Sequence, residues 1–372
     1  MEMDPRYRLN DVSTLLSPSM LVYRPLVREN VTTMLAMARE ADRLRPHVKT
    51  HKMAAVVRLM EEMCIRKHKV STIAEAEMVA SAGGRDVLLA HQLVGPNLGR
   101  LAKLVLAFPE TTFRTIVDDP ATTRALSEAM AETGRSLPVL IDLEVGMGRS
   151  GIAPGDDAAN LYALIDRLPH LEPDGLHLYD GHQRIKDLEA RRAAVRVGYE
   201  QTLALRELLL AQGLPVPRLV LGGTPTFPIH ASWEEPGIEC SPGTCTFHDM
   251  SYSTLFPDLP FVPAVALLTR VISRPRPGRI CLDLGHKAVA ADPSGDRLTL
   301  LGVSEAKFAT HSEEHLVVET PQAETLPVGT PLLAIPTHVC PTSALHKFAY
   351  VIEDGEVVDR WEVTARDRML TI

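Results

Sequence analysis

The segment Arg45–Lys52 gathers two lysines, two histidines and an arginine into a short run that lies between two apolar segments. A lysine that is partly removed from water at the mouth of a barrel or in a cleft has a lowered pKa and can form a Schiff base with an aldehyde. The run therefore has the composition of an amine-based catalytic site. Composition alone also allows a second interpretation, in which the run is a solvated basic face.

We predict a short strand over residues 44–49. Pro46 disfavours a helix at the residue before it and suits the start of a strand. Alternate residues of a strand lie on the same face. His47, Lys49 and His51 are therefore expected to point the same way.

A second chemical pattern lies further along the sequence, where His338 and Cys340 are separated by one residue. If this segment is a strand, the two side chains share a face and both can bind one metal ion. Imidazole together with thiolate suits zinc, and two protein ligands leave positions for water and substrate. The alternative is a buried cysteine beside a histidine in a turn.

Glycine-rich segments follow several of the apolar runs. The glycines of Glu144–Gly151 let the backbone approach a ligand closely, although an ordinary loop has the same composition. Leu221–Thr226 and Ser241–Thr244 combine glycines with hydroxyl groups, and backbone N–H groups in such loops can converge on a phosphate. A tight turn is the alternative for both. The candidate phosphate-binding residues are Gly222, Gly223, Thr224, Gly243 and Thr244.

Short apolar runs alternate with helical patterns from about residue 22 to residue 260, which is typical of a parallel α/β sheet. We predict strands over 87–90, 112–117, 139–143, 175–178 and 218–221. We predict helices over 121–133, 157–168 and 188–211. Eight such units would close a TIM-type (β/α)8 barrel of roughly 250 residues. An open, doubly wound sheet is the alternative, but no G-x-G-x-x-G follows the first strand.

After Pro260 the pattern changes to β-like runs that are separated by turn signals. The strands predicted here are 261–273, 279–284, 298–301, 315–319, 331–335 and 347–352. A hairpin is predicted at Glu353–Glu356. We therefore expect a barrel domain over residues 22–260 and a β domain formed by residues 1–21 and 261–372, which carries the two metal ligands.

The octet RPHVKTHK and the segment Thr337–Thr342 resemble motifs of the fold-type III pyridoxal-phosphate enzymes, and most closely the branch of D-threonine aldolase and D-serine dehydratase. This resemblance implies an alanine-racemase-like barrel that binds pyridoxal 5'-phosphate through the glycine and threonine residues named above. It also implies that Lys49 forms the Schiff base, that Arg149 faces the pyridine nitrogen, and that Tyr179 lies near the cofactor.

The resemblance leaves the second base open. Aldolases of this family carry a histidine beyond the tyrosine, near the metal, but in this chain that offset falls on Ile185. His182 lies closer to Tyr179 and is our candidate for this catalytic role. The alternative is that His182 is a solvated loop histidine.

The same resemblance assigns His338 and Cys340 to a divalent metal, which we expect to be zinc, with manganese or magnesium as alternatives. Overall motif spacing favours a lyase that cleaves D-threonine-like D-β-hydroxy amino acids to glycine and an aldehyde. Cysteine at the second metal position is typical of the dehydratases, so an enzyme that converts D-serine or 3-hydroxyaspartate to a keto acid and ammonia is the first alternative. An amino-acid racemase or a non-catalytic cofactor-binding protein is the second.

Composition limits the partners of this protein of 372 residues. Its formal net charge of −8 and the absence of a basic arm give no sign of nucleic-acid binding. No apolar run approaches the roughly 20 residues that span a bilayer, so we expect no membrane partner. Five scattered cysteines fit reduced thiols and a cytoplasmic location. The resemblance adds the expectation of a homodimer.

Overall fold

The computed structural model describes residues 4–372, and their contacts divide the chain into two compact units. The barrel unit is formed by residues 33–49, 54–243 and 367–372. The strand unit is formed by the described residues up to Thr32 and by residues 50–53 and 244–366. Helix α1 (Arg24–Ala38) passes from the strand unit into the barrel unit.

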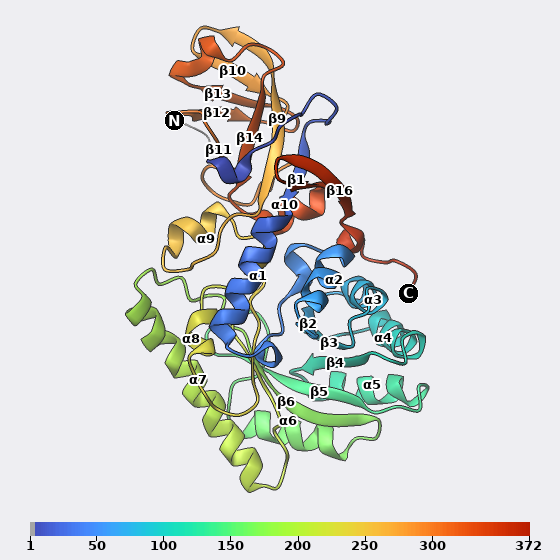
Figure 1. Ribbon diagram of the computed structural model, residues 1–372. Coiled ribbons are helices and arrows are strands. Elements are labelled where there is room, and N and C mark those ends of the chain that lie inside the picture. The colour runs from blue at the N-terminus through green and yellow to red at the C-terminus, as the bar shows by residue number, and fades with distance from the viewer. Residues whose placement is uncertain (1–3) are drawn as a thin grey trace. The chain divides into compact units, whose positions relative to one another are not determined.

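The barrel unit contains a curled sheet of seven parallel strands that pair in the order of the sequence (Figure 1). Most of these strands are short runs buried on both faces, as parallel sheets covered by helices require. The strands are β2 (Lys67–Val70), β3 (Asp86–Leu89), β4 (Thr112–Val117), β5 (Leu137–Leu143), β6 (Leu171–Leu178), β7 (Leu219–Leu221) and β8 (Ile238–Cys240). Five of them match predicted strands, and the predicted parallel α/β barrel is confirmed.

The run 44–47 occupies the place between β8 and β2. The Arg45 N–H donates to the Cys240 carbonyl at 2.9 Å, and the His47 N–H donates to the Pro242 carbonyl at 2.8 Å. On the other side, the Lys69 N–H donates to the Pro46 carbonyl at 2.9 Å. The run thus takes the eighth position around the barrel through isolated bridges rather than as a full strand.

The predicted strand over 44–49 is wrong after His47, because Val48–Thr50 form a 3-10 turn. The ring Nδ1 of His47 accepts the Lys49 N–H at 3.3 Å, and such a local hydrogen bond competes with strand pairing. Pro46 has no N–H to give to a neighbouring strand. The consequence is that Lys49 projects from a turn and not from a strand.

Helices connect the barrel strands and cover the outer side of the sheet (Figure 1). They are α2 (Ala54–Glu62), α3 (Ile73–Ser81), α4 (Pro96–Ala107), α5 (Pro120–Ala131), α6 (Asp156–Arg167), α7 (Leu188–Ala211) and α8 (Phe227–Ala231). Three of them start at a side-chain cap, in which Thr72, Asp119 or Asp187 accepts an N–H of the first turn. The prediction for α7 agrees with the structure at both ends.

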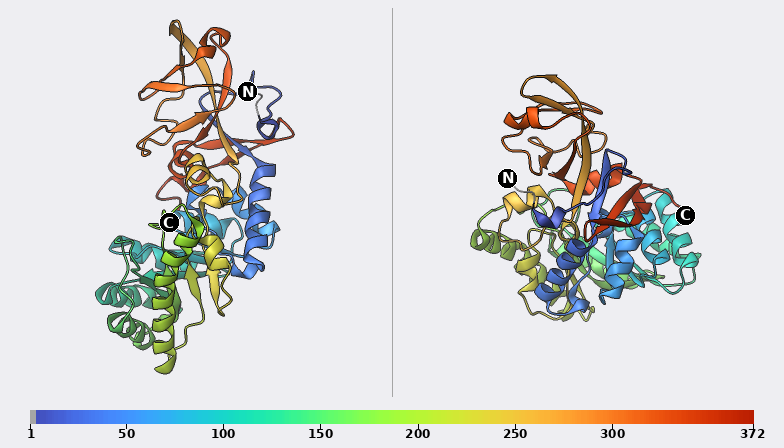
Figure 2. Two further views of the ribbon diagram at one scale, coloured as in Figure 1. Left: turned by 90° about the vertical axis from the view of Figure 1, so that its left-hand side faces the viewer. Right: turned by 45° about the horizontal axis from the view of Figure 1, so that its top comes forward.

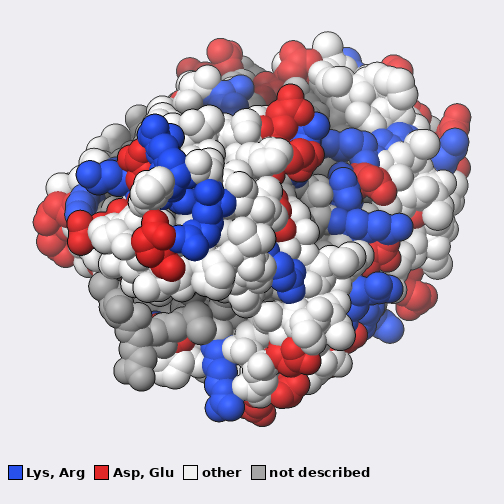
Figure 3. Space-filling model, turned by 90° about the horizontal axis from the view of Figure 1, so that it is seen from above, with Lys and Arg blue, Asp and Glu red and all other residues white. Residues whose placement is uncertain are grey.

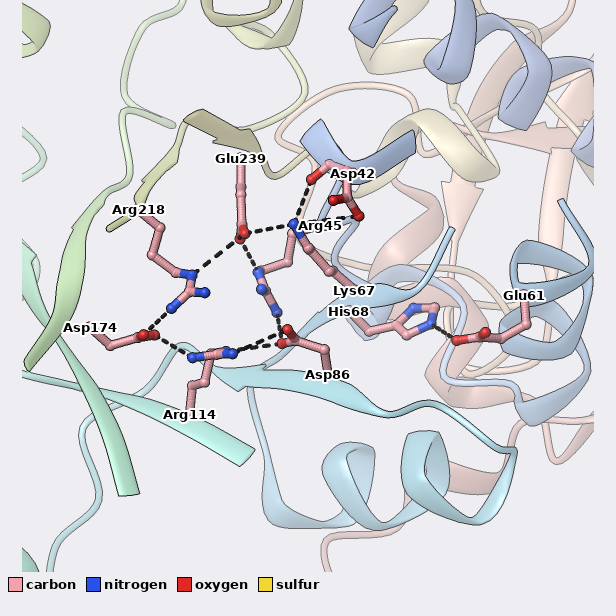
Figure 4. Close-up of polar contacts among 10 residues, drawn as sticks. All are labelled: Asp42, Arg45, Glu61, Lys67, His68, Asp86, Arg114, Asp174, Arg218 and Glu239. Atoms are coloured by element: carbon pink, nitrogen blue, oxygen red, sulfur yellow. Dashed lines mark hydrogen bonds and ion pairs between the residues drawn. The ribbon is translucent and has the colours of Figure 1, made fainter. Parts of the chain in front are cut away.

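A ring of alternating charges connects the barrel strands toward their N-terminal ends (Figure 4). In order, the ring contains Arg45, Asp86, Arg114, Asp174, Arg218 and Glu239, and Glu239 returns to Arg45. Arg45 is fully buried, and its guanidinium lies 2.6 Å from both Glu239 and Asp86. Above the ring, Leu88, Ile116, Leu140 and Val220 form a packed layer inside the barrel. In such a barrel, a site is expected at the C-terminal ends of the strands.

The strand unit contains one mixed sheet of nine strands (Figure 2). Its strands are β1 (Ser19–Tyr23), β9 (Val265–Arg276), β10 (Arg279–Leu282), β11 (Leu298–Leu300), β12 (Lys307–His311), β13 (Leu316–Glu319), β14 (Pro331–Pro336), β15 (Phe348–Glu353) and β16 (Glu356–Glu362). β1 lies between β9 and β15, so the first strand of the chain pairs with strands of the last third. The predicted hairpin is confirmed, because Asp354 and Gly355 connect β15 to β16 with positive φ angles of 52° and 80°.

Two short helices complete the strand unit, α9 (Met250–Leu255) and α10 (Val339–Leu345). The side chain of Asp249 caps α9 by accepting the Tyr252 N–H. Its second carboxylate oxygen accepts the Val339 N–H at the start of α10 at 3.1 Å. One buried carboxylate therefore fixes the starts of both helices.

Candidate active site

A cavity of about 430 Å³ lies in the barrel unit, lined mainly by residues at and after the C-terminal ends of the strands. In barrel proteins this end carries the catalytic residues. The residues that line the cavity are His47, Lys49, Lys69, Ser71, Ala90, His91, Gln92, Ile116, Asp118, Arg149, Ser150, His177 and Tyr179. Lys49, Arg149 and Tyr179 were predicted from the sequence, and the cavity brings them together.

Three cationic groups surround the ring of Tyr179. The Lys49 Nζ lies 5.4 Å from the ring centroid, the Arg149 guanidinium carbon 4.6 Å and the Lys69 Nζ 5.8 Å. Among residues 4–372, no carboxylate forms an ion pair with the Lys49 amine. An amine in such a position is available for an aldehyde and for anionic groups of a ligand.

The predicted common face of the histidines in the octet is only partly present. His47 and Lys49 both line the cavity of the barrel unit. His51 belongs to the strand unit, where it is fully buried and its ring lies 6.0 Å from that of Phe247. The turn at Val48–Thr50 is the reason, because it ends the strand alternation on which the prediction rested.

Arg149 is carried by a loop that its own glycines and a carboxylate hold in shape. Glu144 accepts hydrogen bonds from the N–H groups of Gly146 and Gly148. Gly151 has φ +100°, and a Cβ there would lie 2.8 Å from the Glu144 backbone nitrogen. Only glycine fits this position without a clash, so the path of the loop that carries Arg149 depends on it.

The loops after β7 and β8 fit a phosphate group. Gly222 has φ +76°, and a Cβ there would lie 2.5 Å from the His230 ring. The Gly243 N–H points toward the Thr224 hydroxyl at 3.3 Å. Ser241 is buried, and its hydroxyl has no hydrogen-bond partner among the residues that the structure describes. An orphaned buried hydroxyl in a glycine-containing loop suits an oxyanion, so Ser241 fits a phosphate group such as that of pyridoxal 5'-phosphate.

Two of the predicted phosphate-binding residues have other surroundings. A Cβ on Gly223 would lie 3.0 Å from the Tyr179 ring, so this glycine permits close packing of the tyrosine. Thr244 belongs to the strand unit, where its hydroxyl lies 3.5 Å from the Cys340 sulfur. Their roles as phosphate ligands stay predictions.

Asp180 ties the loop after β7 to the segment that follows β6, where Tyr179 is its neighbour in the chain. Its buried carboxylate accepts the Thr226 hydroxyl at 2.6 Å and the His230 Nε2–H at 2.7 Å. Both donors lie just beyond the glycines of the loop after β7. The carboxylate thereby couples the position of the loop to that of Tyr179.

His182 does not line the cavity. Its Nε2 lies near Gly146, where a Cβ would approach it to 3.0 Å, and the same nitrogen contacts the Gln183 amide at 3.0 Å. The other ring nitrogen is buried without a partner among residues 4–372. The role of His182 as a base stays a prediction.

Sequence reasoning missed Lys69, His177 and Asp142. Lys69 contacts His177 Nε2 at 3.3 Å, and His177 Nδ1 contacts the Asp142 carboxylate at 2.7 Å. A signal was present, because each residue is a titratable side chain within a strand of the parallel sheet, where apolar residues are usual. Lys67–Val70 escaped notice as a strand because two lysines and a histidine make it look solvated.

The surroundings shift the pKa values of these three groups. Burial and the nearby charge of Lys49 lower the pKa of the Lys69 amine to about 7. Burial, followed by the Lys69 charge, also lowers the pKa of His177. Burial alone would raise the pKa of Asp142, but the hydrogen bonds from His177 and Ser150 and the nearby positive charges together outweigh burial and lower that pKa. The cavity therefore combines a carboxylate, a neutral imidazole and an amine that titrates near neutrality.

In the strand unit, His338 and Cys340 lie at the start of α10. The predicted strand geometry is wrong, because His338 is the N-terminal cap residue and Cys340 is in the first helical turn. Burial would lower the pKa of His338, but the interactions with Cys340 and with the Asp292 carboxylate together outweigh burial and raise this pKa to about 9.

His338 and Cys340, at the start of α10, have side chains of the kind that bind metals. Imidazole and thiolate together suit zinc. His338 Nδ1 is 2.5 Å from Asp292, an outer partner of the kind that orients a metal-bound histidine. The Thr50 hydroxyl lies 3.2 Å from the Cys340 sulfur. Within residues 4–372, no cluster of three or more His, Cys, Asp or Glu side chains is placed to hold a metal. The assignment of His338 and Cys340 to a metal therefore stays a prediction.

None of the helices in the described part of the chain is both long enough and apolar enough to cross a membrane. The face of the molecule in Figure 3 carries basic and acidic side chains interspersed.

Known proteins resemble this chain over nearly its whole length. The model of the alanine racemase N-terminal domain matches residues 25–249, and the model described as "Putative serine dehydratase domain" matches residues 264–352. D-threonine aldolase of Arthrobacter sp is 30% identical over 364 residues, which cover 94% of this chain and 92% of that relative. The chain belongs to the fold-type III pyridoxal-phosphate family. Its relatives in this family include D-threonine aldolase.

Further relatives of this fold-type III protein include both aldolases and a dehydratase. 3-Hydroxy-D-aspartate aldolase of Paracoccus denitrificans (strain Pd 1222) is 28% identical over 96% of this chain and 94% of its own. D-threo-3-hydroxyaspartate dehydratase of Delftia sp. (strain HT23) is 27% identical over 94% of this chain and 97% of its own. The crystal structure of D-threonine aldolase from Filomicrobium marinum has a TM-score of 0.86 at 30% identity and covers 94% and 96% of the two chains. The predicted family, the alanine-racemase-like fold and the lyase class are confirmed.

Proposed function

We propose that this fold-type III protein is a pyridoxal-phosphate-dependent lyase that cleaves D-threonine-like D-β-hydroxy amino acids to glycine and an aldehyde. The observation that carries the proposal is the cavity in which the unpaired Lys49 amine lies beside Arg149 and Tyr179. The similarity to D-threonine aldolase over 94% of the chain supports the choice of substrate class.

In this proposal, different residues of the barrel unit bind different parts of the cofactor. When bound, pyridoxal 5'-phosphate supplies an electron sink for the bond that breaks at the amino-acid α-carbon. Lys49 would hold the cofactor through its amine, and the loops at Gly222 and Gly243, with the orphaned Ser241 hydroxyl, would hold the phosphate. Arg149, whose guanidinium lies beside the Tyr179 ring, would face the pyridine nitrogen of the cofactor, as the family resemblance implies.

In this proposal, residues of the strand unit bind a metal ion. His338 and Cys340 would bind a divalent ion, for which zinc is the first choice and manganese or magnesium are alternatives. A divalent ion lowers the pKa of a bound hydroxyl group. Asp292 would orient the His338 ring through its hydrogen bond.

A dehydratase is the second candidate. The observation that favours it is Cys340, since cysteine at this position is typical of the dehydratases that the motif resembles. The similarity to a 3-hydroxyaspartate dehydratase over 94% of the chain also supports it. Both reactions start from the same substrate class, so the products must decide between them.

A substrate panel tests the proposal. The purified chain, loaded with pyridoxal 5'-phosphate and zinc or manganese, is incubated with D-threonine, D-serine, D-threo-3-hydroxyaspartate and L-threonine. We expect acetaldehyde and glycine from D-threonine and no product from L-threonine. Pyruvate from D-serine, or oxaloacetate from hydroxyaspartate, would favour the dehydratase. Absence of product from every D-substrate would overturn the proposal.

Lys49→Ala is the matching variant. We expect it to lose the absorbance of the lysine-bound cofactor and at least 100-fold in activity, because no other residue is expected to form this covalent link. Lys103→Ala is the control, since Lys103 is an exposed residue of α4. A Lys49→Ala protein that keeps the imine absorbance would show that another amine binds the cofactor.

Two further expectations belong to this proposal. Within residues 4–372, none of the five cysteines forms a disulfide, which supports a reducing, cytoplasmic location. The family resemblance supports a homodimer.

A further inference from the structure

Lys69, Asp142 and His177 come from three strands of the barrel sheet and meet inside the cavity wall. Lys69 is on β2, Asp142 on β5 and His177 on β6. Their exposed fractions are 2%, 5% and 3%. Burying three titratable groups in a barrel interior is costly unless their hydrogen bonds are satisfied, so their pairing needs an explanation.

The hydrogen bonds define the state of each group. The Asp142 carboxylate accepts the Ser150 hydroxyl at 2.9 Å and His177 Nδ1 at 2.7 Å. Because a carboxylate only accepts, Nδ1 of His177 carries the proton and Nε2 keeps its lone pair. The Lys69 amine therefore donates one N–H to His177 Nε2, at 3.3 Å. Since Lys69 also lines the cavity, the rest of its amine can face a ligand.

The charges around Lys69 oppose one another. Lys49 and Arg149 disfavour a proton on its amine, whereas Asp142 and Asp180 favour one. Burial is the largest influence, and it also disfavours the charged form. No carboxylate among residues 4–372 forms an ion pair with the Lys69 amine. Near neutral pH, the Lys69 amine can therefore be either neutral or charged.

We propose that Lys69 is a second proton-transfer group of the cavity, and that His177 and Asp142 are its positioning residues. This inference rests on the proposed function, in that a substrate amino acid occupies the cavity. The neutral Lys69 amine takes a proton from an O–H or C–H group of the ligand, and the ligand keeps the electron pair of the broken bond. The resulting ammonium holds this proton, or passes one to His177 Nε2, whose imidazolium is stabilised by the Asp142 carboxylate. Returning the proton to the product restores the starting state.

Chemical labelling measures the proton on Lys69 directly. The cofactor-free protein, in which the Lys49 amine is charged, is treated with a trace of acetic anhydride at pH values from 5 to 10, and acetylation of each lysine is followed by peptide mass spectrometry. We expect the labelling of Lys69 to rise with a midpoint at about pH 7. In Asp142→Asn the midpoint should fall, because a carboxylate that favours the charged amine is gone. A midpoint above pH 10, or no labelling at any pH, would overturn the proposal, since such an amine is charged or sealed from the cavity.

Kinetics of two substitutions separate proton transfer from mere charge or packing. With the best substrate of the panel, Lys69→Met should lower kcat by about 100-fold or more, in the range of general acid–base catalysis. Lys69→Arg should not restore it, because a guanidinium keeps its proton at neutral pH. Wild-type kcat should fall below pH 7, where Lys69 becomes protonated, and His177→Gln should move this limb of the profile. If Lys69→Arg works as well as wild type, only the positive charge matters and the proposal is wrong.

The controls keep the result interpretable. Lys103→Met, on the exposed face of α4, should leave kcat and its pH profile unchanged. The cofactor absorbance of each variant reports whether loading is intact. If every substrate of the panel fails but Lys69 labels with a midpoint near pH 7, the proposed function is wrong while the titrating amine remains. If the panel succeeds and the midpoint lies above 10, the function stands and the role of Lys69 falls.

Discussion

Two amines in one cavity have different surroundings. Lys49 is half-buried on a 3-10 turn, whereas Lys69 is buried on a strand and hydrogen-bonded to His177. A turn lets a side chain enter a ligand site from its rim, and a strand holds a side chain in the wall. The two lysines are therefore suited to different tasks, covalent attachment for the first and proton exchange for the second.

The anchor at Asp180 gives a prediction at this scale. Asp180→Asn replaces a carboxylate that accepts hydrogen bonds from Thr226 and His230 by an amide that can accept only on one side. The loop after β7 then loses a charged hydrogen bond, which costs about 1–3 kcal/mol. We expect the affinity for pyridoxal 5'-phosphate to fall about tenfold or more, measured by absorbance titration of the cofactor-free protein.

Asp157→Asn is the control for this substitution, because Asp157 is an exposed residue of α6. It should leave the cofactor affinity unchanged. Equal affinity in Asp180→Asn and wild type would mean that the phosphate loop keeps its shape without the anchor.

At the scale of elements, the barrel closes at a place where strand pairing is weak. The run 44–47 is joined to its neighbours by isolated bridges only. The ring of alternating charges crosses this place, because Arg45 connects Glu239 of β8 with Asp86 of β3 (Figure 4). The hydrophobic layer above the ring lacks a member from this run. At the run 44–47, ion pairs between side chains thus add to the few backbone hydrogen bonds that join it to the sheet.

Arg45→Met tests this role. Removing one partner of a buried ion pair leaves uncompensated buried charge, here on Glu239 and Asp86, and costs about 3–5 kcal/mol. We expect the free energy of unfolding, measured with urea, to fall by this amount. Arg39→Met is the control, because Arg39 pairs with Glu234 on the surface, where ion pairs contribute little. A fall as small as that of the control would mean that water reaches the ring and screens its charges.

At the scale of the whole molecule, the candidate residues are divided between two units. The barrel unit carries the cavity with Lys49, Arg149 and Tyr179, and the strand unit carries His338 and Cys340. β1 belongs to the strand unit although it lies at the start of the sequence. This division predicts that loss of the metal and loss of the cofactor can be separated experimentally.

Metal removal tests the division. Treatment with a chelator, or His338→Ala, should lower lyase activity at least tenfold while the absorbance of the bound cofactor stays, because no residue of the barrel unit is changed. Zinc or manganese should restore the treated wild-type protein but not His338→Ala. Metal content is measured by plasma mass spectrometry, with roughly one ion per chain expected in the wild type.

The control is His315→Ala, since His315 is exposed elsewhere in the strand unit. It should keep both metal and activity. Full activity in a metal-free wild-type protein would remove the metal from the proposed function.

Most strands and helices were predictable from the sequence. Apolar runs such as 112–117 and the helical pattern of 188–211 reflect local burial and backbone hydrogen bonding, which depend on residues close in the chain. The octet around Lys49 was also recognisable, because its residue types are unusual at that spacing. Strands such as Lys67–Val70 were missed, because charged side chains conceal a strand whose buried position depends on its neighbours.

Only the tertiary structure decided which polar residues meet. Lys69 reaches His177 across 108 residues of chain, and Asp142 reaches it across 35, because the sheet sets β2, β5 and β6 around one interior. The tertiary structure also determined the backbone conformation at Lys49 and at His338. A side-chain hydrogen bond at His47 and the start of α10 replaced the strands that alternation predicted. Sequence spacing describes neighbours along the chain, whereas a site is made by the pairing of distant strands.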